Sequence, residues 1–158
     1  KTLKAQTARF LHMSVELPFA PVDSIIRQNA GGLRVSAEAT EELTRRIQSR
    51  GAKLAVDAAN EATKDGRKTL MASDFGVSDV PDKDALELPI APVDRIARLD
   101  IDDRYRVSME ARIALASLLE VYANDIAAAA ALLADHTGRR TVKAEDIEVY
   151  FELIEYIE

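Results

Sequence analysis

The sequence contains one proline-bounded phrase, an eight-residue segment, in two copies. Residues 16–23 read ELPFAPVD and residues 87–94 read ELPIAPVD, so seven of eight letters agree at a spacing of 71 residues. An internal repeat constrains the fold strongly, because each copy must build the same supersecondary unit and neighbouring copies then share a core.

The agreement continues beyond this phrase at a spacing of 72, after one inserted residue. The triplet RVS at 34–36 recurs at 106–108, GRKT at 66–69 recurs as GRRT at 138–141, and Asp74 recurs as Asp146. The matches keep their order along each copy. The chain is therefore a tandem duplication.

Each copy predicts three helices, so the expected fold class is all-α. The prolines of the repeated phrase suit the first turn of a short helix, where a missing N–H is no loss. Long helices of roughly 36–65 and 108–137 follow. Ser36 and Ser108 are good N-caps for them, and Gly66 and Gly138 stand where a glycine would end each one.

The third helix should differ between the copies. It is expected to begin near Met71 in the first copy and near Lys143 in the second. Gly76 and Pro81 should weaken or end it in the first copy, whereas the second runs on through apolar residues toward the C-terminus.

A long helix between two short ones cannot bury its apolar stripe alone, so we expect the two copies to pair. The predicted units are a first fold at 16–79, a linker at 80–86 and a second fold at 87–158. Residues 1–15 are interpreted as a disordered leader or expression remnant. The alternative is a basic tail that touches DNA.

Composition and charge exclude several classes of protein. Hydrophobic residues make up 47% of the chain and charged residues 30%, which permits a packed core, and the absence of cysteine excludes disulfides and thiolate metal sites. No apolar run is expected to be long enough to span a membrane, and no signal peptide is visible. The net charge of −6 by itself argues against a nucleic-acid partner.

The repeated pattern nevertheless resembles the histone fold. ELPxAP, RVS and GR[KR]TxxxxD, in that order and present twice, resemble the archaeal histones over residues 16–158. Two copies in one acidic, alanine-rich chain are similar to the fused histone doublets of salt-loving archaea. At molar salt the Debye length is only about 3 Å, so a net negative charge would repel DNA little.

The resemblance implies a binding partner and a surface. The copies would pair head to tail as an intramolecular histone dimer, which would bind double-stranded DNA and organise or compact the nucleoid of the cytoplasm. Arginines of the first loops would enter the minor groove, and second-loop residues would contact phosphates. The implied DNA-binding residues are Arg27, Arg34, Lys68, Thr69, Arg95, Arg98, Arg106, Arg140 and Thr141. Ser24, in place of the base found as Arg95, and Met71, in place of Lys143, depart from the family pattern.

The resemblance also implies structural roles. Arg67 with Asp74, and Arg139 with Asp146, would form ion pairs that fix the second loops. Leu133, His136 and Asp146 would form a contact between two copies of the chain, giving a homodimer of doublets. No cofactor, metal or membrane partner is implied.

Two other interpretations remain beside this one. Catalysis by His136 with Asp146 is disfavoured, because the chain has no nucleophile motif, glycine-rich phosphate loop or metal-ligand cluster. A histone-fold transcription regulator that acts mainly through protein partners, with weak or local DNA contact, is the second, and the acidity favours it. Arg45, Arg46 and Arg50 are expected to form a solvated face balanced by Glu41 and Glu42.

Overall fold

The helices of the chain follow the duplication. The computed structural model describes residues 14–157, so most of the leader expected at 1–15 lies outside the described residues. The α-helices are α2 (Phe19–Asn29), α3 (Ala37–Lys64), α4 (Ile90–Ala97), α5 (Met109–His136) and α6 (Ala144–Ile157). Short strands and turns complete the described part: β1 (Arg34–Val35), β2 (Thr69–Leu70), β3 (Arg106–Val107), β4 (Thr141–Val142), and the 3-10 turns η1 (Ala72–Phe75) and η2 (Lys83–Ala85).

Local signals set the ends of the long helices. The Ser36 hydroxyl accepts from the Ala39 N–H at 3.1 Å, and the Ser108 hydroxyl accepts from Ala111 at the same distance. Gly66 and Gly138 have φ of +73° and +76°, a region that favours glycine, and they follow the C-caps of α3 and α5. The predicted caps and stops are confirmed.

The third element differs between the copies as the sequence predicts. In the first copy it is only the four-residue turn η1, which Gly76 ends with a φ of +76°. In the second copy it is the 14-residue helix α6. The first repeat is therefore the shorter of the two at this end.

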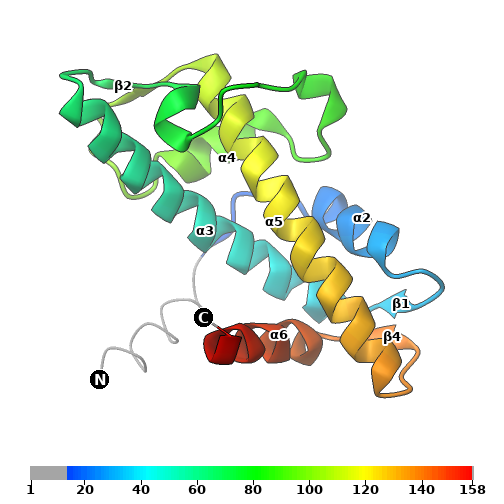
Figure 1. Ribbon diagram of the computed structural model, residues 1–158. Helices are drawn as coiled ribbons and strands as arrows, with labels where there is room; N and C mark the ends of the chain where they lie inside the picture. The colour runs from blue at the N-terminus through cyan, green and yellow to red at the C-terminus, as the bar shows by residue number, and fades with distance from the viewer. Residues whose placement is uncertain (1–13, 158) are drawn as a thin grey trace.

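The strands join one repeat to the other. β1 pairs in parallel with β4, with Arg34 opposite Thr141, and β2 pairs in parallel with β3, with Thr69 opposite Arg106. Each pair places the first loop of one repeat beside the second loop of the other. The two pairs lie toward opposite ends of the long helices (Figure 1).

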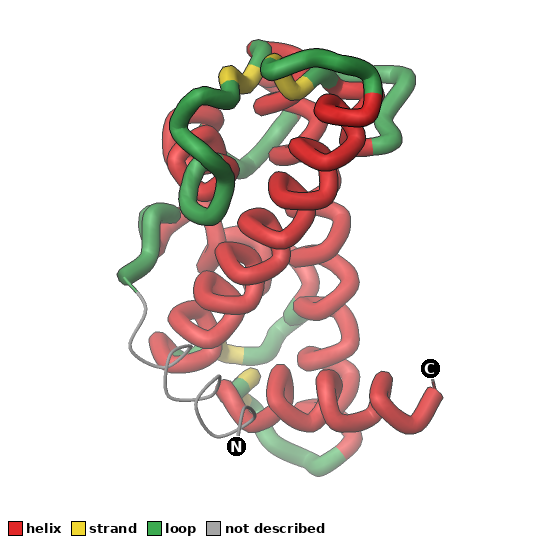
Figure 2. The backbone as a smooth tube through the Cα atoms, turned by 90° about the vertical axis from the view of Figure 1, so that its left-hand side faces the viewer, coloured by secondary structure: helices red, strands yellow, loops and turns green. Residues whose placement is uncertain are grey.

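The long helices cross and form one core with the shorter helices around them (Figures 1 and 2). One close approach involves Gly51, which is buried in α3. A Cβ atom there would lie 2.7 Å from Ile96 Cγ2 of α4 and 3.0 Å from Leu119 Cδ1 of α5. Only a residue without a side chain lets α3 pass this close to the second repeat.

The helix α5 corrects one expectation. It is the one helix in the described part of the chain that is long and apolar enough to cross a membrane by length and composition. It lies in the centre of the core, packed against α2, α3, α4 and α6, and its buried positions are mostly alanine. Its apolar character is that of a core helix.

Candidate nucleic-acid interface

The strand pairs build two clusters of cations and hydroxyls. The Arg34 N–H donates to the Arg140 carbonyl at 2.8 Å, and Arg34 is opposite Thr141 in the strand register. The β1–β4 cluster (Arg34, Arg140, Thr141) therefore unites residues from the two repeats that are far apart in the sequence.

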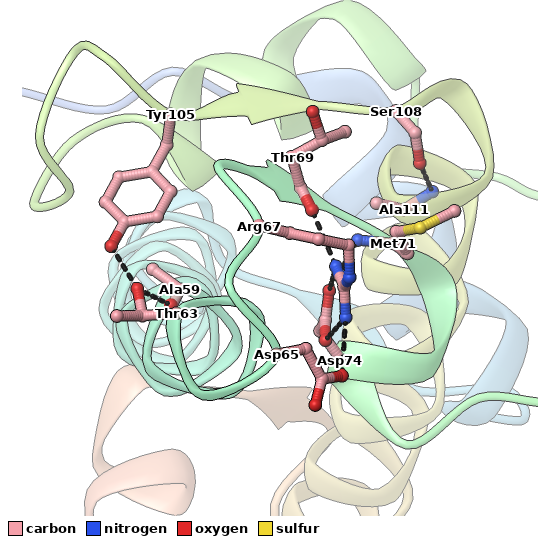
Figure 3. A network of polar contacts seen from close by, with 10 residues as sticks. All are labelled: Ala59, Thr63, Asp65, Arg67, Thr69, Met71, Asp74, Tyr105, Ser108 and Ala111. Atoms are coloured by element: carbon pink, nitrogen blue, oxygen red, sulfur yellow. Dashed lines mark hydrogen bonds and ion pairs between the residues drawn. The ribbon is translucent and has the colours of Figure 1, made fainter.

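The second cluster repeats this arrangement at the other strand pair. The Arg106 N–H donates to the Lys68 carbonyl at 2.8 Å, and Thr69 is opposite Arg106. In this β2–β3 cluster (Lys68, Thr69, Arg106), Lys68 Nζ lies 4.9 Å from the ring centroid of Tyr105. The hydroxyl of Tyr105 shares a hydrogen bond with Thr63 of α3, as Figure 3 shows. Leu33 occupies the matching place at the β1–β4 cluster, so the clusters are not identical.

The cations of both clusters face solvent. Arg34, Lys68, Arg106 and Arg140 are exposed. Within residues 14–157, none of these four forms a salt bridge with a carboxylate. Each end of the molecule thus carries cations that are outside any salt bridge among the described residues, which suits an anion.

Behind each cluster, an arginine clamps the second loop. Arg67 Nη1 donates to the Thr69 carbonyl at 2.8 Å and to Asp74 Oδ2 at 2.9 Å, while its Nη2 donates to Asp74 Oδ1 at 2.9 Å (Figure 3). Asp74 also accepts from the Met71 N–H at 2.8 Å. Arg67 is the main cause that lowers the pKa of Asp74. The pair fixes the loop that carries Lys68 and Thr69.

The second repeat has the same clamp. Arg139 donates to the Thr141 carbonyl at 2.9 Å and to both oxygens of Asp146, and the Lys143 N–H donates to Asp146 at 2.7 Å. The hydrogen bond to Asp146 is the main cause that raises the pKa of Arg139. The structure thus brings each of the two expected ion pairs together.

The three remaining cations of the expected surface lie on or near the first helices and have acidic partners. Arg27 lies 2.7 Å from Asp23, and Arg98 lies 3.1 Å from Asp94. Arg95 of α4 reaches Glu16, just before α2, at 3.0 Å. These distances are between nitrogen and carboxylate oxygen. We call this set of arginines (Arg27, Arg95, Arg98) the central arginines.

Sequence reasoning named the central arginines but missed their partners. Asp23 and Asp94 precede Arg27 and Arg98 by four residues on a helix, which is a recognisable signal for an ion pair. The partner of Arg95 is 79 residues away in the chain, so no sequence signal pointed to it.

The arginines of α3 are placed differently from the expected solvated face. Glu42 is buried, and it accepts from Arg45 at 3.2 Å and from Arg46 at 2.8 Å. The Arg46 guanidinium also stacks 4.1 Å from the centroid of Phe151 in α6. The expected balance of charge is confirmed for Glu42, and Arg50 and Glu41 are exposed as expected. The solvated face is wrong for Arg45 and Arg46, which are half-buried, and α6 covers Arg46.

The expected contact between chains involves the end of α5 and the start of α6. Leu133 is half-buried, His136 is exposed and Asp146 is buried. No hydrogen bond joins His136 to Asp146 within the described part of the chain, and no group there of three or more His, Cys, Asp or Glu could hold a metal.

Comparison with known proteins identifies relatives of each repeat. The model of the family described as histone-like transcription factor (CBF/NF-Y) and archaeal histone matches residues 15–76 and again residues 86–149. One of the subunits of the archaeal histone HAN1 from Thermococcus zilligii is 49% identical over 63 residues, which are 40% of this chain and 91% of that protein.

Two solved structures match across both repeats. The histone from Methanopyrus kandleri is 27% identical, with a TM-score of 0.63 over 84% of this chain and 91% of that chain. A protein from Thermus thermophilus has a TM-score of 0.68 over 90% of this chain and 99% of that chain. Its identity of 16% makes it similar in fold alone.

Proposed function

Because this chain belongs to the family of histone-like transcription factors (CBF/NF-Y) and archaeal histones, we propose that it binds double-stranded DNA with the surface that carries both strand-pair clusters. Histone-fold proteins are structural DNA-binding proteins, and the chain is not an enzyme. It would organise or compact DNA in the nucleoid of the cytoplasm.

We propose that two histone folds, 16–79 and 87–158, pair head to tail within the single chain, with 80–86 as the linker. The strand pairs β1–β4 and β2–β3 support this arrangement, because each takes one strand from each repeat. The match to a single chain of the Methanopyrus kandleri histone over 84% of this chain also supports it, since neither repeat alone is that long.

One observation carries the proposed DNA contact. Both ends of the molecule present an arginine from a first loop beside a cation and a threonine from a second loop. Guanidinium in a narrow minor groove is attracted by negative potential without reading bases, and a flanking hydroxyl and cation suit phosphate oxygens. Arg34 and Arg106 would take the groove role. The central arginines would face the DNA between these ends.

The proposed self-association uses the second fold. Leu133 and His136 at the end of α5 would meet the same residues of a second chain, and His136 would reach Asp146 across the two-fold axis. Asp146 already accepts two hydrogen bonds from Arg139 and one from the Lys143 N–H, yet a carboxylate has about four acceptor sites, so one more donor can be accommodated. The matching positions in the first fold are Glu61 and Lys64, which are charged and pair with each other.

The net negative charge of the chain supports a second candidate function. A transcription regulator of the same fold, acting through protein partners, would tolerate the net charge of −6 without needing salt to screen it. It predicts weak DNA binding that does not depend on the strand-pair clusters.

The experiment replaces Arg34 and Arg106 together by alanine and measures binding to random-sequence duplexes across potassium chloride concentrations. The double variant should bind all duplexes about 10- to 100-fold more weakly, and the log–log salt slope should fall by about 1.8. The charge-matched control replaces Lys53 and Lys83, which are exposed and outside the clusters. Equal binding by the double variant and the control would refute the assignment of this surface.

A further inference from the structure

The central arginines are neutralised by the protein itself. Their side chains are about half exposed, at 56% for Arg27, 55% for Arg95 and 41% for Arg98. Each is nonetheless within 3.1 Å of a carboxylate oxygen. The acids are more buried than the bases, with 18% of the Asp23 side chain exposed and 19% of Asp94.

Two of these acids are also held by a second residue. Asp23 accepts from the Thr40 hydroxyl of α3 at 3.1 Å, and Asp94 lies 3.2 Å from Arg112 Nε of α5. Arg112 is itself tied to the Val107 carbonyl of β3 at 3.2 Å. Because both carboxylates are anchored on a long helix, they cannot simply swing away when another anion approaches their arginine.

The strand-pair clusters lack this feature. Among the described residues, no carboxylate forms a salt bridge with Arg34 or Arg106, although the net charge of the chain is negative. On the proposed DNA surface the cations therefore differ in pairing: among the described residues, those at the two ends form no salt bridge, and those in the middle each have a carboxylate partner.

We propose that Asp23 and Asp94, with Glu16, serve as built-in counter-ions that occupy the central arginines and so limit how tightly DNA is held. A phosphate that approaches the centre exchanges with a carboxylate of the protein rather than with a free ion. Such an exchange releases little salt and leaves the displaced carboxylate close to the phosphate. The duplex is then fixed at the two strand-pair clusters and held weakly between them.

This inference rests on the proposed function and differs from a purely structural role for the acids. As exposed helix pairs at i and i+4, Asp23–Arg27 and Asp94–Arg98 would stabilise their helices only slightly. A structural role predicts a small loss of stability and no gain in DNA binding when the acids are neutralised. The counter-ion role predicts tighter binding.

The test combines Asp23→Asn with Asp94→Asn, which keeps the shape and leaves an amide to accept from Thr40. At about 0.2 M potassium chloride the variant should bind a random-sequence duplex roughly 5- to 20-fold more tightly than wild type. The log–log salt slope should steepen by about 1.8, because Arg27 and Arg98 become free to contact phosphates while Arg112 keeps its hydrogen bond to the Val107 carbonyl. Thermal melts of each variant check that the fold is kept.

The matched control combines Asp57→Asn with Asp125→Asn. It removes the same two charges from exposed sites on the long helices, and it also frees a base, Lys53, from a partner four residues away. It should change affinity less than about 2-fold. Adding Arg27→Ala and Arg98→Ala to the Asp23/Asp94 variant should cancel its gain in DNA affinity. The two alanine changes should also lower DNA affinity by a larger factor in that variant than in wild type.

Two outcomes separate this inference from the proposed function. If wild type binds through Arg34 and Arg106 but the Asp23/Asp94 variant gains no more than the control, the counter-ion role is refuted and the DNA-binding function stands. If neither wild type nor the variant binds duplex DNA even at about 0.05 M potassium chloride, the proposed function itself fails.

Discussion

Replacement of Gly51 by alanine tests the crossing of the long helices, since a single methyl group there meets the opposite repeat. Alanine favours a helix by about 1 kcal/mol over glycine, so local propensity alone would stabilise the variant. The new Cβ would lie 2.7 Å from Ile96 Cγ2 and 3.0 Å from Leu119 Cδ1, both in buried side chains that have little room to move. Overpacking of this kind costs about 1–3 kcal/mol. We expect a net destabilisation of about 1 kcal/mol.

Chemical and thermal denaturation followed by circular dichroism, at one fixed salt concentration, would measure this change. For a chain of this size a loss of about 1 kcal/mol lowers Tm by about 2–4 °C. The matched variant is Gly51→Ala combined with Ile96→Ala, which removes the closest methyl group. The pair should be at least about 0.5 kcal/mol more stable than the sum of the single changes predicts. A Gly51→Ala protein as stable as wild type or more, with no coupling to Ile96, would refute the close approach of α3 to the second repeat.

Three further predictions concern the loop clamp, the pairing of the repeats and self-association. Asp74→Asn should destabilise the fold by about 2 kcal/mol at neutral pH, because it breaks the ion pair with Arg67. The folded pKa of Asp74 is lowered, so this stability is present above pH ~4 and is lost as the pH falls through the folded pKa. The free energy of unfolding should therefore depend less on acid pH in the variant than in wild type, and parallel curves for the two proteins would contradict the clamp. A fragment of residues 14–80 would expose Leu43 and Ile47, which are fully buried in the whole chain, and should be unfolded or aggregated in high salt; a cooperative monomeric melt would show that the repeat folds alone. Leu133→Glu should halve the mass measured by light scattering in molar potassium chloride while helix content is kept, and an unchanged mass would reject the contact through the second fold.

The candidate site divides into a part that the sequence could predict and a part that it could not. The neighbours of Arg34 and Arg106 were named through the family resemblance, because a duplicated motif that matches a known fold carries that fold's pairing with it. The acidic partners of the central arginines were not named. The family pattern implies which residues would approach DNA, but it does not say which carboxylates of this chain pair with them.

Local sequence signals, such as capping residues and glycines, determine where the helices begin and end. Ser36 caps α3 through an N–H three residues on, and Gly66 ends the same helix by adopting a positive φ, so both effects act within a single turn. The short third element of the first repeat was predicted for the same reason, since Gly76 stops η1 locally. The duplication can be read from the sequence, and it sets the order of the elements in each repeat.

Tertiary structure alone decided contacts between distant parts of the chain. The stacking of Arg46 on Phe151 exists because α6 of the second repeat packs against α3 of the first. Glu16 meets Arg95 across 79 residues for a similar reason. A periodic pattern reports which face of a helix is apolar, but the charge that a side chain meets depends on which distant segment folds over it, and therefore on the packing of the whole chain.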